Sequence, residues 1–234
     1  MSTFTWLTGH RPALTQAQLE RRQRLLEAAP LDTCTLQQQR FVVLDLETSG
    51  LNMRRDVVLS IGAVVIENSA IDLSQQFECT LQREGHQPSA STLIHGIAPS
   101  EIAKGEDPAE ALLAFMEFVG ASPLLAFHAE FDQRMLARAL KHSLGYRLQH
   151  AFFDVAEIAP LLCPKAAAGT LGLDGWTQHF GLQVQQRHHA SADALVTAEL
   201  ALILLSKARQ QGLDSLQTLL HQLNSRRRQR AHSM

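Results

Sequence analysis

The chain has 234 residues, of which 45% are hydrophobic and 19% charged, a composition typical of folded globular proteins rather than disordered ones. No stretch reaches the roughly 18 unbroken apolar residues that a membrane span needs, and the first residues lack the apolar core of a signal peptide, so we expect a cytoplasmic protein without a membrane partner. Three cysteines without a CxxC pair argue against a disulfide framework, and a net charge of −2 gives no nucleic-acid signal by itself.

Residues 1–39 are predicted to form an N-terminal helical extension. Thr15 followed by Gln18 resembles a capping box that opens a helix through ALTQAQLERRQRLLEAA, and Pro30 ends it. The leucines of this helix form a narrow apolar stripe. The helix could therefore pack on the main domain or join two copies into a homodimer, and the sequence leaves both interpretations open.

Three strands are predicted next. FVVLDLE at 41–47 is apolar and β-branched, as a buried strand should be, and it is followed by VVLSIGAVVIEN at 57–68 and QQFECTLQRE at 75–84. Short turns at 49–50 and 68–69 favour antiparallel neighbours.

Helices and strands alternate in the rest of the chain. The predicted order is a loop over 88–107 with a short helix at 99–101, a helix at 108–119, a strand at 124–128, a helix at 130–143, a strand at 150–155, and helices at 156–162, 170–180, 190–209 and 213–223. This order indicates an α/β domain with a mixed sheet, antiparallel at one side and parallel at the other. We place the main domain at 40–207, and a C-terminal helix with a basic tail at 208–234.

Two carboxylates interrupt the first strand. Residues two apart in a strand share a face, so Asp45 and Glu47 point the same way, near the carboxyl end where ligands bind in α/β sheets. Two like charges there must share a proton or a cation, and Mg²⁺ or Mn²⁺ suits oxygen ligands. The alternative is that one acid caps a turn or pairs with Arg54 or Arg55, and the pair alone does not decide between them.

Two later segments carry further candidates. In FHAEFD at 127–132, Asp132 starts an amphipathic helix at the same sheet edge, although an Asp in a first helical turn is also ordinary helix-dipole chemistry. In RHHASADA at 187–194, Ser191 could cap a largely apolar helix with Asp193 in its first turn. His188 lies five residues earlier, and a His there could take a proton from water at neutral pH.

Together these segments predict a site for phosphodiester hydrolysis. Four carboxylates can hold two hard cations about 4 Å apart, an arrangement that clamps the attacking and leaving oxygens of a phosphodiester. The sequence therefore predicts two Mg²⁺ or Mn²⁺ ions, with His188 deprotonating the attacking water.

VVLDLETSG, FHAEFD and HHASADA, in that order, resemble the three motifs of the DEDDh 3′–5′ exonucleases, which include the epsilon proofreading subunit of bacterial DNA polymerase III, RNase T and oligoribonuclease. The resemblance implies a ribonuclease H-like fold with a mixed five-stranded sheet flanked by helices. It also implies a nucleic acid with a free 3′ end as partner, with single-stranded DNA as the expected substrate and nucleoside 5′-monophosphates as products. Alternatives are an RNA-directed exoribonuclease and a catalytically silent module that binds nucleic acid.

The resemblance also implies the active-site residues. Asp45 and Glu47 match the acids of the first motif, Asp132 that of the second and Asp193 that of the third. These four residues would hold the metal ions. His188 matches the histidine that names the subgroup.

Substrate contacts are implied in the same way. Thr48 and its backbone would meet the 3′-terminal nucleotide, and LIHGIAPSEI resembles the segment of the family that lines the terminal-base pocket, with His95, Gly96 and Ile97 as candidates. His128 stands where many relatives have an Asn that contacts the strand. This departure bears on substrate preference more than on catalysis.

Overall fold

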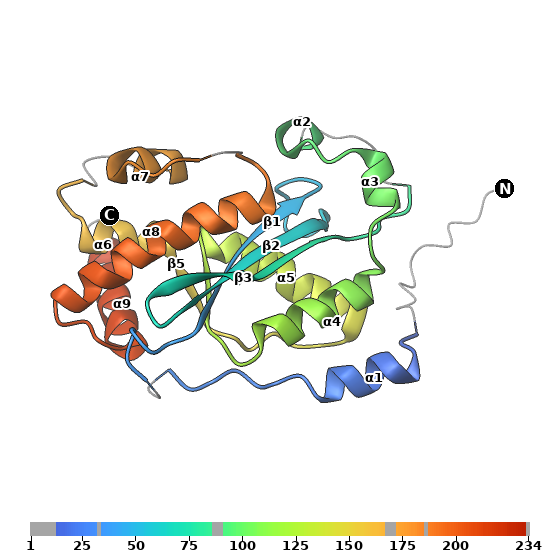
Figure 1. Ribbon diagram of the computed structural model, residues 1–234, viewed down its shortest axis with the longest axis horizontal. Helices are drawn as coiled ribbons and strands as arrows, with labels where there is room; N and C mark the ends of the chain where they lie inside the picture. The colour runs from blue at the N-terminus through green and yellow to red at the C-terminus, as the bar shows by residue number, and fades with distance from the viewer. Residues whose placement is uncertain (1–12, 32–33, 86–90, 167–171, 185–186, 233–234) are drawn as a thin grey trace.

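A five-stranded mixed sheet with the order β3-β2-β1-β4-β5 forms the centre of the protein (Figure 1). The computed structural model describes residues 13–31, 34–85, 91–166, 172–184 and 187–232. The strands are β1 (Phe41–Thr48), β2 (Val58–Glu67), β3 (Ala70–Thr80), β4 (Leu124–Ala126) and β5 (Phe152–Asp154). β1 pairs antiparallel with β2 and parallel with β4. This ribonuclease H-like sheet confirms the predicted fold class.

The β2–β3 hairpin shows how local chemistry sets the register. Asn68 and Ser69 have φ values of 51° and 61°, and two left-handed residues match the twist of a two-residue hairpin. β3 therefore begins at Ala70, directly after the turn and five residues before the predicted start, because residues 70–72 already pair with β2. The β1–β2 connection, predicted as a short turn at 49–50, is instead a loop over residues 49–57.

Helices cover both faces of the sheet. α4 (Pro108–Val119) and α5 (Ala129–Leu144) pack on the face that carries Leu44 and Leu46, and α8 (Ala190–Gln210) packs on the face that carries Phe41 and Val43 (Figure 1). Alternate residues of β1 thus enter two separate cores, as the period of a strand requires. No helix within the described ranges combines the length and apolar character needed to cross a membrane.

Short helices fill the connections. They are α2 (Thr92–His95), α3 (Pro99–Ala103), α6 (Val155–Leu162) and α7 (Leu173–Phe180). α2 was not predicted. The strand predicted to reach residue 128 ends at Ala126, because His128 is left-handed, with φ 63°, and turns the chain into α5.

Both ends of the described chain pack on the domain. The predicted capping box is confirmed: the Gln18 N–H donates to Thr15 Oγ1 at 3.2 Å, and the Thr15 N–H donates to Gln18 Oε1 at 2.9 Å. However, α1 (Gln16–Gln23) ends well before Pro30, because the chain then turns to donate the Ala29 N–H to the Ala121 carbonyl at 2.9 Å. α1 lies against α4 of the same chain through Arg21.

The C-terminal helix is longer than predicted. α9 (Leu216–His232) continues through the arginine-rich segment that we expected to be a tail. Leu216, Leu219 and Leu223 are buried in the same core as α8. The first part of the helix is therefore part of the domain core, and Arg227 in its later part forms an ion pair with Glu157 of α6.

Candidate active site

Three carboxylates from two elements converge at one end of the sheet. Asp45 and Glu47 extend from β1, and Asp193 lies in the first turn of α8. One carboxylate oxygen from each lies within 4.8 Å of the others. Hard oxygen donors of this kind suit Mg²⁺ or Mn²⁺, so the residues present fit the predicted metal.

A glycine allows this convergence. Gly62 of β2 pairs with Asp45 of β1. A Cβ at position 62 would lie 2.1 Å from the Ala190 carbonyl carbon and 2.1 Å from the Ser191 nitrogen. The start of α8 thus rests directly on β2, which brings Asp193 beside Asp45. Our sequence analysis missed this role, although a glycine inside an apolar strand is a known sign of close backbone approach.

The trio of Asp45, Glu47 and Asp193 is electrostatically unfavourable without a cation. Burial raises the pKa of Asp45 well above its usual range, and the charges of Asp132, Glu47 and Asp193 raise it further. Burial, followed by the charge of Asp193, raises the pKa of Glu47 to about 7. A bound divalent cation would relieve this repulsion, because an opposite charge favours the ionised carboxylates.

Arg187 supplies part of the missing positive charge. Its guanidinium forms an ion pair with Asp193, and its Nε donates to Asp174 Oδ1 of α7 at 2.5 Å. The same charge lowers the pKa values of Asp45 and Glu47, although burial outweighs it. From the sequence, Arg187 or the terminal arginines were candidates to hold the nucleic-acid strand; the ion pair of Arg187 with Asp193 was not predicted.

Asp132 lies beside the trio. It is buried in the first turn of α5, and its carboxylate oxygens fall outside the group of three within 4.8 Å. The pKa of Asp132 is raised to about 8, and burial is the largest cause. The charges of Asp154 and Glu47 also raise it, whereas the backbone N–H groups of Asp132 and Leu46 lower it. Asp132, the fourth predicted acid, therefore lies close enough to Glu47 for the charge of Glu47 to raise its pKa.

The two histidines before α8 have different environments. His188 is exposed and left-handed, with φ 62°, and its backbone N–H donates to Asp193 Oδ2 at 3.1 Å. His189 occupies the N-cap position that we predicted for Ser191, which lies instead in the first turn and contacts His189 Nδ1 at 3.0 Å. The His189 ring also lies 3.4 Å from Glu78.

A cleft of about 300 Å³ opens beside the acids. Its lining includes Glu47, His188 and all three residues predicted for the terminal-base pocket, His95, Gly96 and Ile97. His95 is buried, and its Nδ1 accepts the Ile97 N–H at 3.1 Å, which fixes the ring at the cleft wall.

The two other predicted substrate residues lie near the site in different ways. Thr48 is buried, and its hydroxyl donates to the Gly50 carbonyl at 2.9 Å, so it shapes the loop after β1. His128 is exposed before α5, and its backbone N–H donates to Asp154 Oδ1 at 3.0 Å. The same Oδ1 accepts the Ala156 N–H at 2.9 Å. Asp154 therefore fixes the turn that leads to Asp132; our sequence analysis did not single it out, although Asp before a helix is a common N-cap.

A family model described as Exonuclease, of the RNase T type, matches residues 42–201. The chain belongs to this exonuclease family. The 3′–5′ exonuclease resemblance predicted from the three motifs is thereby confirmed. Its members use divalent metals, in agreement with the acidic cluster of Asp45, Glu47 and Asp193.

Curated relatives of this exonuclease chain are much longer proteins. A PolC-type DNA polymerase III of Bacillus subtilis (strain 168) is 27% identical over 203 residues, which cover 84% of this chain and 14% of that protein. An epsilon-like protein of DNA polymerase III from Rhodobacter capsulatus is 30% identical over 198 residues, which cover 83% of this chain and 27% of that protein. The chain thus spans a minor part of the relatives that it matches.

Solved exonuclease structures share the fold. Exonuclease I of E. coli in complex with a dT13 oligonucleotide has a TM-score of 0.62 at 19% identity, over 74% of this chain and 42% of that chain. Exonuclease X in complex with 5′ overhanging duplex DNA has a TM-score of 0.57 at 18% identity, over 71% of this chain and 91% of that chain.

Proposed function

We propose that this protein is a metal-dependent 3′–5′ exonuclease that releases nucleoside 5′-monophosphates from single-stranded DNA. The observation that carries the proposal is the convergence of the Asp45, Glu47 and Asp193 carboxylates within 4.8 Å of one another. Membership of the exonuclease family supports the reaction class. The dT13 oligonucleotide bound to Exonuclease I supports single-stranded DNA as the substrate, and the duplex bound to Exonuclease X supports DNA in general.

The four acids would hold the metal. Asp45, Glu47 and Asp193 form the common group, and Asp132 adjoins it from α5, a donor set suited to two Mg²⁺ or Mn²⁺ ions. When bound, such cations supply Lewis acidity and neutralise the charge that develops on a phosphodiester. The carboxylates themselves keep the cations at the end of β1, beside the cleft.

His188 is the proposed general base. Its exposed ring lines the cleft with Glu47, so a ring nitrogen can accept the proton of an attacking water. The backbone bond from His188 to Asp193 keeps this ring close to the proposed metal ligands. The base therefore depends on the same turn that places Asp193.

The cleft would receive the 3′-terminal nucleotide. His95, Gly96 and Ile97 line it together with His188, and Thr48 supports the loop after β1. His128, exposed at the start of α5, would contact the strand as it leaves the cleft.

The test is a time course on end-labelled single-stranded DNA, duplex DNA and RNA of one sequence, with Mg²⁺, with Mn²⁺ and with EDTA. We expect stepwise loss from the 3′ end of single-stranded DNA that stops with EDTA and resumes on adding metal. The Asp45→Asn and Asp193→Asn variants should be inactive, whereas Glu130→Gln, which changes a surface acid paired with Arg134, should be active. Faster cleavage of RNA would support an exoribonuclease, and tight binding without cleavage would support a silent module.

A further inference from the structure

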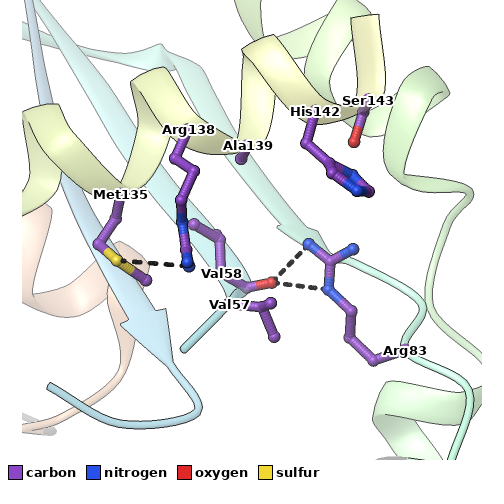
Figure 2. A pocket seen from close by; sticks show the side chains of 8 residues that line it. All are labelled: Val57, Val58, Arg83, Met135, Arg138, Ala139, His142 and Ser143. Carbon is purple, nitrogen blue, oxygen red and sulfur yellow. Dashed lines mark hydrogen bonds between the residues drawn. The ribbon is translucent and has the colours of Figure 1, made fainter. Parts of the chain in front are cut away.

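A second cavity lies between the side of α5 and the start of β2 (Figure 2). Its volume is about 260 Å³. α5 packs on the face of the sheet opposite α8, and the cavity shares no lining residue with the acidic cleft. It is therefore a separate place in the molecule.

Three basic side chains line this cavity. Arg83, Arg138 and His142 extend towards it from two directions, the first from the segment after β3 and the others from α5 (Figure 2). Its described lining contains no carboxylate. The apolar wall of the cavity is formed by Val57 and by Met135 and Ala139 of α5, the helix that also carries Arg138 and His142 (Figure 2).

The two arginines are held in place without an acid. The Nε and Nη2 of Arg83 donate to the Val58 carbonyl at 3.1 and 2.9 Å, and Nη1 has no partner among the described residues. Arg138 contacts the Met135 sulfur at 3.9 Å, and neither arginine forms an ion pair with a described acid. Arg134, one turn earlier on α5, pairs with Glu130 at 2.5 Å. The cavity arginines thus differ from an ordinary surface arginine on the same helix.

This arrangement places two positive charges near each other with no carboxylate in the described lining. Burial lowers the pKa of Arg83, and the charge of Arg138 lowers it further, so the two guanidinium groups repel each other near the cavity. Guanidinium groups bind phosphate with charge-assisted hydrogen bonds, and a phosphate would compensate both charges. The apolar wall provides contact for an uncharged body attached to that phosphate.

We propose that this cavity binds the phosphate of a nucleotide, with Arg83, Arg138 and His142 on the phosphate and the apolar wall on the base or sugar. The nucleotide has two sources: one unit of a bound strand, or a free mononucleotide. A strand bound at the active site could reach this cavity. Arg138 lies six residues beyond Asp132 on α5, about 9 Å along the helix at its usual rise. Val58 of the cavity also pairs with Thr48, next to Glu47.

The test measures binding by the full chain in EDTA, where cleavage does not occur. NMR signals of the arginine Nε–H groups are followed during titration with inorganic phosphate, thymidine 5′-monophosphate and a short thymidine oligonucleotide. We expect the signals of Arg83 and Arg138 to shift. Arg138→Ala should weaken binding roughly tenfold, the scale of one lost charge-assisted hydrogen bond, and Arg138→Lys should restore part of it. Arg134→Ala is the matched control and should leave the affinity unchanged.

Comparison of the mononucleotide with the oligonucleotide distinguishes the two possible sources of the bound nucleotide. If the mononucleotide binds as tightly as the oligonucleotide, the site takes free nucleotides; if only the oligonucleotide shifts the signals below millimolar concentration, it takes a strand. The proposal is overturned if no ligand shifts Arg83 or Arg138, or if Arg134→Ala and Arg138→Ala weaken binding equally. Because no metal or turnover is involved, the result is independent of the nuclease proposal.

Discussion

The backbone N–H of His188 donates a hydrogen bond to Asp193 Oδ2 at 3.1 Å. The proposed general base and a proposed metal ligand are therefore connected through the backbone rather than through the imidazole. This geometry allows the ring to be changed without loss of the bond that orients Asp193.

Replacement of His188 should separate catalysis from metal binding. His188 is left-handed, with φ 62°, a conformation that Asn tolerates better than Ala, so His188→Asn removes the base while keeping the turn. We expect cleavage to fall roughly 10²–10⁴-fold, the usual scale for a general base, with the affinity for Mn²⁺ unchanged. Single-turnover cleavage and calorimetric Mn²⁺ titration measure the two effects. His221→Asn, an exposed change on α9, is the control, and unchanged turnover in His188→Asn would exclude the proposed role.

Gly62→Ala should displace α8 from the sheet. The new methyl group would lie 2.1 Å from backbone atoms of Ala190 and Ser191, which cannot move without shifting the start of α8. We expect a loss of about 1–3 kcal/mol in the free energy of unfolding, the usual cost of overpacking. Weaker metal binding and slower cleavage should accompany it, because Asp193 moves away from Asp45.

Urea unfolding and metal titration check this prediction against Gly172→Ala. A Cβ at position 172 meets no atom of the described residues within 4 Å, so that variant should bind metal like the original protein. Normal metal affinity in Gly62→Ala would show that the β2–α8 contact does not position Asp193.

Glu47 and Gly62 show which features of the site can be predicted from the sequence and which cannot. The pairing of Asp45 with Glu47 follows from the two-residue period of a strand, and the placement of Asp132 and Asp193 follows from helix starts at a sheet edge. These features are local, and the predicted five-stranded sheet follows from the same patterns. The role of Gly62 depends on how α8 crosses β2, and that of Arg187 on contacts with two helices, which no local pattern contains. The early end of α1 has the same cause, since Ala29 bonds to a distant carbonyl.

Asp154 should act as a positioning residue. Its Oδ1 accepts the N–H groups of His128 and Ala156, so it fixes both the turn before α5 and the start of α6. Asp154→Ala removes both bonds and should cost about 1–2 kcal/mol of stability, the scale of a lost N-cap. Cleavage should slow because the turn that carries Asp132 loosens.

Asp154→Asn provides the matched comparison. An Asn side chain keeps an oxygen acceptor and is a good N-cap, so it should recover most of the stability and activity that Ala loses. Thermal melting and the cleavage rate are measured for both variants. Equal losses in Ala and Asn would mean that the carboxylate charge matters, rather than its hydrogen bonds.

The metal-free protein should become less stable as pH rises. In the folded state the pKa of Glu47 is raised to about 7 and that of Asp132 to about 8, so the folded protein holds these protons more tightly than the unfolded chain. Their stabilising contribution is full below the unfolded pKa values near 4 and is lost as pH rises through 7 and 8. The melting temperature in EDTA should therefore fall between pH 5.5 and 8.5.

A divalent cation should reverse this trend, because it binds the ionised carboxylates and competes with protons for them. We expect the increase in melting temperature caused by Mg²⁺ to grow over the pH range in which stability in EDTA declines. Asp132→Asn should flatten the decline in EDTA, since it removes the carboxyl whose pKa is raised to about 8. A decline of the same steepness in Asp132→Asn would place the titrating group elsewhere, and a Mg²⁺ effect independent of pH would indicate that the cation binds away from these acids.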